Sequence, residues 1–167
     1  IISILPATIP DAPVFLWDAH QDTVPVGGMT IKPFVPVIEK GYLYGRGSCD
    51  VKGGMAAMVS ALGQLSVLET RHASVVFVAS VNEEFGFSGA KAFTNLLRSD
   101  DSESSNEGDD TAKELLQKVV AVGFHLVVVA EPTNLRLVTQ HKGAVRWRIK
   151  VCGRSCHSSY PEKGVNA

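Results

Sequence analysis

The stretch "ASVVFVASVNEE" (residues 73–84) joins an almost continuous apolar run, Ala73–Val81, to two adjacent acids, Glu83 and Glu84. Such a run is typical of a strand in the middle of a sheet that is covered on both faces. Successive side chains on a strand point to opposite faces, and two neighbouring like charges repel each other. The sequence therefore predicts a central strand whose end carries an acidic pair that other groups must offset.

Two further apolar runs resemble this one. Val14–His20 ("VFLWDAH") and His125–Ala130 ("HLVVVA") are predicted to be buried strands. The stretch Phe34–Gly45 is predicted to form a hairpin around Lys40 and Gly41. Apolar side chains recur at helical spacing over Met55–Thr70, which predicts a helix. Further helices are predicted over Ser88–Arg98 and over Thr111–Val122, where Thr111 and Glu114 match a capping box. Strands that alternate with helices in this way predict an α/β fold with a largely parallel sheet.

The last part of the sequence changes character. Leu135–Gln140 and Ala144–Val151 are predicted strands, and the second alternates apolar with basic side chains, as a half-exposed strand does. A domain boundary is therefore expected near Gly143, with one domain over residues 1–143 and the first strand and helix start of another over residues 144–167. The stretch Ser99–Asp110 is acidic and lacks apolar side chains, which predicts a solvated loop.

Composition excludes several classes of partner. The 167 residues are 45% hydrophobic and 20% charged with a net charge of −1, so no strong field favours nucleic acid or an anionic membrane. No apolar run approaches the ~20 residues of a membrane helix, and the start "IISILPATIP" lacks the positive region of a signal peptide. The sequence has no initiator methionine and ends in "EKGVNA", like the opening of a helix, so we expect a piece of a longer protein.

The three cysteines, Cys49, Cys152 and Cys156, are odd in number and sparse, which argues against a disulfide framework. They fit a reducing compartment, which predicts a cytoplasmic protein. The stretch "CGRSCH" could suggest a metal knuckle, but a structural zinc site needs four ligands and no second pair follows. We therefore expect free thiols.

Each of the three apolar runs ends in a residue that can bind a metal or move a proton: His20, the pair Glu83 and Glu84, and Glu131. Sites in open α/β sheets lie outside the carboxyl ends of the strands, so these side chains are expected at one edge, with Asp50 joining them from the glycine-rich turn "GRGSCDVKGG". One imidazole with several carboxylates suits Zn²⁺, Co²⁺ or Mn²⁺. A single acid at a strand end is more often a helix cap or a solvated residue. Several converging acids favour two metal ions that share a bridging carboxylate.

Five ordered motifs resemble those of the M20 family of metallopeptidases and deacylases. They are "HQDTVP" (residues 20–25), "GRGSCDVKGGMAA" (45–57), "NEEFGFSGA" (82–90), "AEPTN" (130–134) and "GRSCHSSYPEKGVNA" (153–167). The stretches "EPTNLRLVTQHKG" and "HSSYPEKGVNA" most resemble the acetylornithine deacetylase branch. The resemblance implies a three-layer, zinc-exopeptidase-like α/β domain with a mostly parallel mixed sheet, followed by the start of an α+β lid or dimerisation domain.

The resemblance also implies a role for each matching residue. His20 and Glu131 would bind one zinc ion, Glu84 would bind a second, and Asp50 would bridge the two. Glu83 would be the general base, Asp22 would orient His20 through its other ring nitrogen, and His157 would reach the active site of a partner subunit to stabilise an oxyanion.

The implied activity is hydrolysis of the amide bond of an N-acyl amino acid by a water that bridges two divalent metals, in a protein that forms a homodimer and binds a small-molecule substrate. A dipeptidase, carboxypeptidase or desuccinylase of the same family is an alternative. A metal-binding or dimerisation piece without catalysis is another, because family members carry a further metal-binding histidine near the C-terminus, and this sequence ends at Ala167 before any such residue.

Overall fold

A computed structural model describes residues 1–98, 110–121, 123–143, 145 and 147–167. The predicted acidic loop therefore lies outside the described residues, apart from Asp110. The chain divides into two compact units, Ile1–Leu135 and Arg136–Ala167, and each is described by itself. The assignment of the second unit to a separate lid domain stays a prediction.

The first unit is built on a four-stranded sheet with the order β1-β5-β2-β6. The strand β2 (Val14–His20) has the predicted bounds. The strands β5 (Ser74–Ser80) and β6 (Leu126–Val129) are each one residue shorter at both ends than predicted. These three run parallel, and β1 (Ile2–Leu5) pairs antiparallel with β5. The sheet is thus mixed and mostly parallel, as the sequence predicted, although β1 itself was not foreseen.

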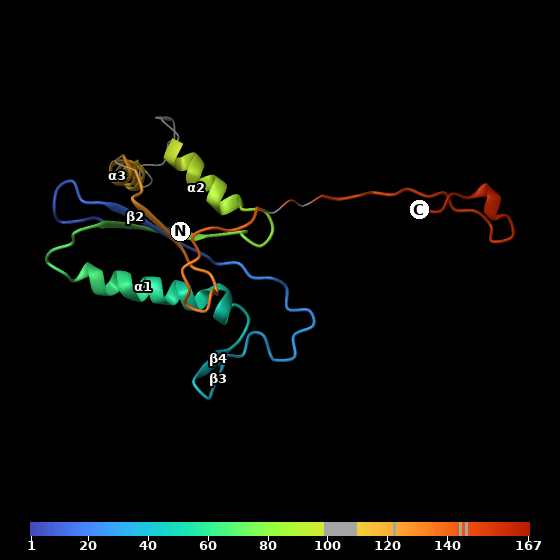
Figure 1. Ribbon diagram of the computed structural model, residues 1–167, viewed down its shortest axis with the longest axis horizontal. Coiled ribbons are helices and arrows are strands. Elements are labelled where there is room, and N and C mark those ends of the chain that lie inside the picture. The colour runs from blue at the N-terminus through green and yellow to red at the C-terminus, as the bar shows by residue number, and fades with distance from the viewer. Residues whose placement is uncertain (99–109, 122, 144, 146) are drawn as a thin grey trace. The chain divides into compact units, whose positions relative to one another are not determined.

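Helices cover both faces of this sheet (Figure 1). Alternate residues of β5 separate two cores, because Val76 and Val78 face one side while Phe77 and Ala79 face the other. On the first side they pack with α2 (Ser88–Arg98) and α3 (Asp110–Val120), and on the second with α1 (Gly53–Ser66). The first core consists of Val14, Val76, Val78, Phe93 and Leu116, and the second of Ala19, Val51, Phe77, Ala79 and Ala130. This three-layer α/β/α arrangement confirms the predicted fold class.

The segment before α1 is placed by close backbone contact. Gly47 has a left-handed φ of 78°, and an irregular turn, Ser48–Lys52, leads from it into the helix. A Cβ atom on Gly54 would lie 2.9 Å from the Cβ of Ala130, so the start of α1 approaches the end of β6 more closely than any side chain would permit. This contact brings Asp50, in the turn, toward Glu131, which lies two residues after the end of β6.

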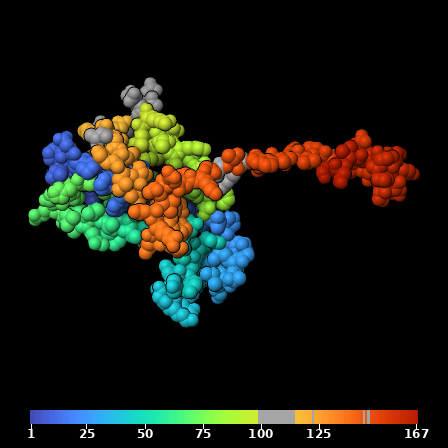
Figure 2. All heavy atoms as spheres, in the orientation of Figure 1, coloured from blue at the N-terminus to red at the C-terminus, as the bar shows by residue number. Residues whose placement is uncertain are grey.

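The predicted hairpin is present as β3 (Val37–Glu39) and β4 (Tyr42–Tyr44). Lys40 and Gly41 both have positive φ, 51° and 83°, as a two-residue turn of type I′ requires. All six strand residues are exposed, and Figure 2 shows this part of the first unit, in cyan, standing out into solvent.

The second unit corrects two predictions. The described residues of Leu135–Gln140 and Ala144–Val151 form no strand. A strand needs hydrogen bonds from a neighbour, and the pairing found in the described part of this unit is a single bridge between Arg154 and Val165. The alternating apolar side chains remain exposed. A short 3₁₀ turn, Pro161–Lys163, takes the place of the expected helix start. None of the described helices has the length and apolar character to cross a bilayer.

Candidate metal centre

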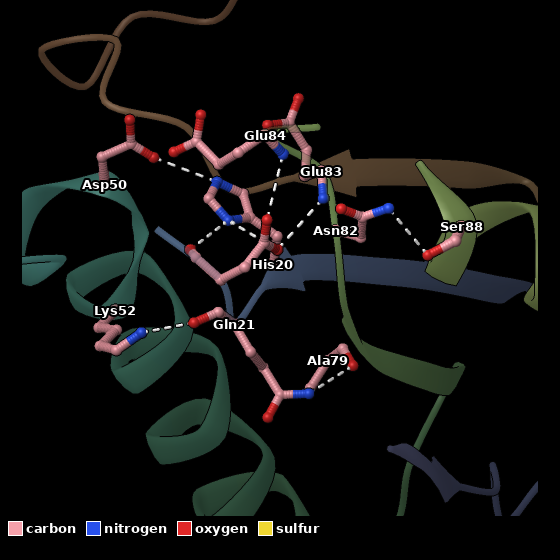
Figure 3. Close-up of polar contacts among 10 residues, drawn as sticks. His20, Gln21, Asp50, Lys52, Ala79, Asn82, Glu83, Glu84 and Ser88 are labelled. Atoms are coloured by element: carbon pink, nitrogen blue, oxygen red, sulfur yellow. Dashed lines mark hydrogen bonds and ion pairs between the residues drawn. The ribbon is translucent and has the colours of Figure 1, made fainter. Parts of the chain in front are cut away.

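The carboxyl ends of three parallel strands meet at one edge of the sheet. His20 is the last residue of β2 and pairs in register with Ser80, the last residue of β5. Glu83 and Glu84 follow β5, and Glu131 follows β6 by two residues. Figure 3 shows the two glutamates at the same end of the sheet as His20 and Asp50. The convergence that the strand ends predicted is therefore present.

The orientation of the His20 ring is defined by two contacts. The ring is buried, with 3% of the residue exposed. Its Nδ1 lies 2.9 Å from the main-chain carbonyl oxygen of Asp22, which can only accept a hydrogen bond, so Nδ1 carries a proton. Its Nε2 lies 3.1 Å from Oδ1 of Asp50. In the neutral ring, Nε2 is then an acceptor that faces another acceptor.

Two acceptors at this distance require a cation between them or a proton on the ring. A metal ion fits, because ligand atoms of His20, Asp50 and Glu131 all lie within 4.8 Å of one another. Asp50 and Glu131 are exposed and can adjust, whereas His20 is held rigidly by its burial. One imidazole and two carboxylates are common ligands of Zn²⁺ and related divalent ions. The structure thus brings together three of the four predicted metal ligands.

The electrostatics of the site also favour a cation. Although Glu131 is exposed, partial desolvation raises the pKa of its carboxyl, and repulsion from the neighbouring carboxylates, Asp50 foremost, adds to this effect. Burial opposes the charging of His20, but the Asp22 carbonyl and the nearby carboxylates outweigh it and raise the pKa of the ring. Both shifts mean that these side chains bind protons more tightly than isolated side chains do, and a divalent ion would satisfy the same carboxylates.

Glu83 and Glu84 lie beside this group of three without belonging to it. Their carboxylates act electrostatically on Glu131, and that of Glu83 also acts on His20. The assignment of Glu84 as the ligand of a second ion, and of Glu83 as the base, stays a prediction.

Asp22 makes more contacts than the resemblance implied. Its Oδ1 lies at ion-pair distance from Nδ1 of His20, at 3.6 Å, and its main-chain carbonyl makes the shorter contact with the same nitrogen. The carboxylate also accepts hydrogen bonds from two successive main-chain N–H groups, those of Glu83 and Glu84, at 3.1 Å each. These bonds outweigh partial burial and lower the pKa of Asp22.

His157 belongs to the second unit, so only its local surroundings are described. The main-chain N–H of Ser159 lies 3.2 Å from its Nδ1 and donates to it. The proton of the neutral ring is therefore on Nε2, which leaves an N–H donor on the outer side of the ring. The Tyr160 ring lies nearby, with a centroid distance of 6.1 Å, and carries the Lys163 ammonium over its face at 4.3 Å.

Two neighbours of the site were not predicted. Lys52 donates a hydrogen bond from Nζ to the carbonyl of Gln21 at 2.6 Å, which ties the start of α1 to the residue after His20. Asp18 lies within β2, where burial raises its pKa, and its Oδ1 has no hydrogen-bond partner among the described residues. In the sequence, Asp18 is distinguished only as an acidic residue inside an otherwise apolar run, and that pattern could have marked it as a buried acid near the site.

Comparison with known proteins gives a consistent result. Residues 16–157 match the model of Peptidase family M20/M25/M40. The chain is similar to the "Probable carboxypeptidase AN5749" of Emericella nidulans, with 34% identity over 97% of the chain and 35% of that protein. It is similar to the acetylornithine deacetylase of Proteus mirabilis, with 33% identity over 89% of the chain and 33% of that protein. It is also similar to the succinyl-diaminopimelate desuccinylase of Dechloromonas aromatica, with 32% identity over 93% of the chain and 38% of that protein.

The chain thus spans about a third of the length of these curated relatives. Among solved structures, human carnosine dipeptidase 1 superposes with a TM-score of 0.53 over 78% of this chain and 24% of that one, at 20% identity, which is a likeness of fold. The matched region contains all five ordered motifs at least in part, including every residue of the candidate metal centre. The chain belongs to Peptidase family M20/M25/M40.

Proposed function

We propose that this chain provides most of the metal-binding site of a hydrolase that cleaves amide bonds in N-acyl amino acids or small peptides. The observation that carries the proposal is the pair of facing acceptors, His20 Nε2 and Asp50 Oδ1, with Glu131 completing a group that one ion can bind. Family membership supports it, because the similar proteins are named as a carboxypeptidase, a deacetylase and a desuccinylase. The reactions that these names describe all break a bond between an acyl carbon and a nitrogen.

The proposed site holds two divalent ions, with Zn²⁺ first and Co²⁺ or Mn²⁺ as alternatives. His20 and Glu131 would hold one ion, Glu84 the other, and Asp50 would lie between them. Bound metal supplies a polarised carbonyl and a water that is acidic near neutral pH. The family resemblance implies a further histidine at the second ion.

Glu83 is the proposed general base. Its place beside His20 and Glu131, at the end of a rigid central strand, supports this role. The carboxylate would take a proton from the attacking water and later deliver it to the leaving nitrogen, so the products are a carboxylic acid and a free amine. Proton transfer of this kind contributes roughly 10²–10⁴-fold to a rate.

His157 is proposed to stabilise the oxyanion that forms during the attack, from the partner subunit of a homodimer. An oxyanion needs a hydrogen-bond donor, and the contact between Ser159 and Nδ1 keeps the Nε2 proton available for that purpose. We further propose a cytoplasmic location, which the three free, exposed cysteines support.

A substrate panel tests the function. The intact protein, loaded with Zn²⁺, is offered N-acetylornithine, N-succinyl-diaminopimelate, other N-acetyl amino acids and dipeptides, and release of free amine is measured. We expect the fastest release from N-acetylornithine, loss with a chelator and recovery with added metal. Faster cleavage of dipeptides or of the succinyl substrate would replace the deacetylase assignment with the corresponding family alternative. No release from any of them would leave a metal-binding or dimerisation role.

A further inference from the structure

We propose that Asp22 is a positioning residue for the Glu83–Glu84 backbone, in addition to holding His20. Each carboxylate oxygen accepts one hydrogen bond: Oδ1 from the main-chain N–H of Glu83 and Oδ2 from that of Glu84, both at 3.1 Å. The inference rests on the proposed function only for the roles of the two glutamates. The contacts themselves do not depend on it.

The turn after β5 explains why these two N–H groups need an outside acceptor. The carbonyl of Asn82 accepts from the N–H of Gly86 at 3.1 Å and from that of Phe87 at 2.6 Å, which closes a single helical turn. The first N–H groups of such a turn have no carbonyl partner within it. A side-chain oxygen from a capping residue usually satisfies them. Here the Asn82 side chain is directed elsewhere, to Ser88 Oγ at 3.1 Å. Asp22 therefore provides the cap from a different strand.

Burial and charge make this cap effective. Asp22 is 23% exposed, so water competes weakly for its oxygens. Bonds from two N–H groups to an ionised carboxylate are stronger than those between neutral groups. They also lower the pKa of Asp22, in agreement with an ionised acceptor.

The consequence is a single residue that sets the distance between the metal-binding ring and the glutamate pair. The main-chain carbonyl of Asp22 orients His20 through Nδ1, while its carboxylate fixes the backbone of Glu83 and Glu84. If the carboxylate acted on His20 alone, its 3.6 Å separation from Nδ1 would be its main contact, and the glutamate backbone would not depend on it.

Hydrogen exchange of the intact, metal-free protein tests the proposal without reference to turnover. Overlapping peptides that cover residues 80–88 are followed by mass spectrometry in the wild type and in Asp22→Asn. The amide oxygen of asparagine can replace one acceptor, whereas its NH₂ group faces the other N–H. We expect one of the two amides to exchange about tenfold faster or more, as loss of a charge-assisted hydrogen bond predicts. Exchange within β5 should not change.

Asp11→Asn is the matched control, because Asp11 is exposed in a left-handed turn that asparagine also favours, and no change is expected there. Wild-type amides of Glu83 and Glu84 that exchange as fast as unprotected ones would overturn the proposal before any variant is made. Unchanged exchange in Asp22→Asn would overturn it as well. Absence of turnover with intact protection at these amides would instead count against the proposed function alone.

A second measurement separates positioning from a general loss of stability. With metal restored, Asp22→Asn should lower kcat for the amide substrate while KM changes little, because the base is displaced and the binding surface is not. Asp22→Glu, which keeps the charge but lengthens the side chain, should recover part of the kcat. A fall in kcat with no change in amide protection would assign the effect to His20 and contradict the proposed capping of the Glu83 and Glu84 amides by Asp22.

Discussion

The Nε2 atom of His20 lies 3.1 Å from Oδ1 of Asp50, while the proton of the neutral ring is held on Nδ1 by the Asp22 carbonyl. Two acceptors approach in this way only with a cation between them or with a second proton on the ring. The relationship joins the end of the central strand β2 to the turn before α1, two segments 30 residues apart in the chain. It therefore depends on the fold, and it gives the site its affinity for a positive charge.

The first prediction concerns the dependence of stability on pH. The pKa of Glu131 is raised above its ordinary 4.5 and that of His20 above its ordinary 6.5. A raised pKa contributes stability that is complete below the ordinary value and is lost as the pH rises through the raised one. The free energy of unfolding of the metal-free protein should therefore fall as the pH rises through this window. The pKa of Asp22 is lowered from its ordinary 3.8, so this residue affects the free energy of unfolding only at a pH below that window.

Urea unfolding over this pH range, with a chelator and with Zn²⁺, measures the effect. Metal binding requires deprotonated ligands, so the metal-loaded protein should gain stability as the pH rises. A metal-free protein whose stability also rises across the window would contradict the assigned electrostatics of the site.

The second prediction concerns the base. Glu83→Gln should bind metal as the wild type does but lose roughly 10²–10⁴-fold in kcat, because the amide cannot accept the proton of the attacking water. Glu39→Gln, on the exposed hairpin, is the control and should be fully active. Metal content and turnover are measured on the same samples, and retained turnover in Glu83→Gln would rule out this assignment.

The third prediction concerns the contact between α1 and β6. Gly54→Ala places a Cβ 2.9 Å from that of Ala130, so the turn that carries Asp50 must move away from Glu131. We expect weaker metal binding and a loss of ~1–3 kcal/mol from overpacking. Gly63→Ala, in the same helix with open space around it, should instead stabilise by ~0.4–1 kcal/mol. Adding Ala130→Gly to the first variant should restore metal binding, and failure to do so would contradict the contact.

The fourth prediction concerns the turn after β5. A Cβ on Gly89 would lie 2.5 Å from the main-chain nitrogen of Val81 and 2.7 Å from its oxygen. Gly89→Ala should therefore displace the turn that carries Glu83 and Glu84 and reduce kcat, with Gly63→Ala again as the control. Thermal unfolding and turnover check this, and normal kcat in Gly89→Ala would show that the turn tolerates the shift.

Much of the fold could be predicted because its signals are local. The apolar run of β5 begins and ends at a serine, and three of its seven residues are β-branched valines, while β2 ends at the polar His20. Their parallel pairing then brings His20 and the acids after the strands to one edge, which is why the candidate ligands were found from strand ends alone. The fold class followed from the alternation of these strands with helices.

Other features depend on contacts that the sequence does not display. The residues of β1 pair with residues of β5 that lie 70 to 76 positions further along the chain, and four residues carry too weak a pattern to reveal the strand. The stretches Leu135–Gln140 and Ala144–Val151 show the opposite error, since a strand-like pattern forms no strand without a partner among the described residues. The carboxylate contacts of Asp22 were missed because its partners are main-chain N–H groups, which every residue except proline possesses.

The most direct test of the account is metal binding by the intact protein, measured by equilibrium dialysis against Co²⁺ or Mn²⁺ for the wild type, His20→Ala and the exposed-histidine control His72→Ala. Cys152→Ser is included so that thiol binding is recognised. We predict tight binding by the wild type, His72→Ala and Cys152→Ser, and affinity at least about 100-fold lower in His20→Ala, since even the outer partners of a metal site are worth ~10–100-fold. Equal affinity in His20→Ala and the wild type would contradict the proposed metal centre.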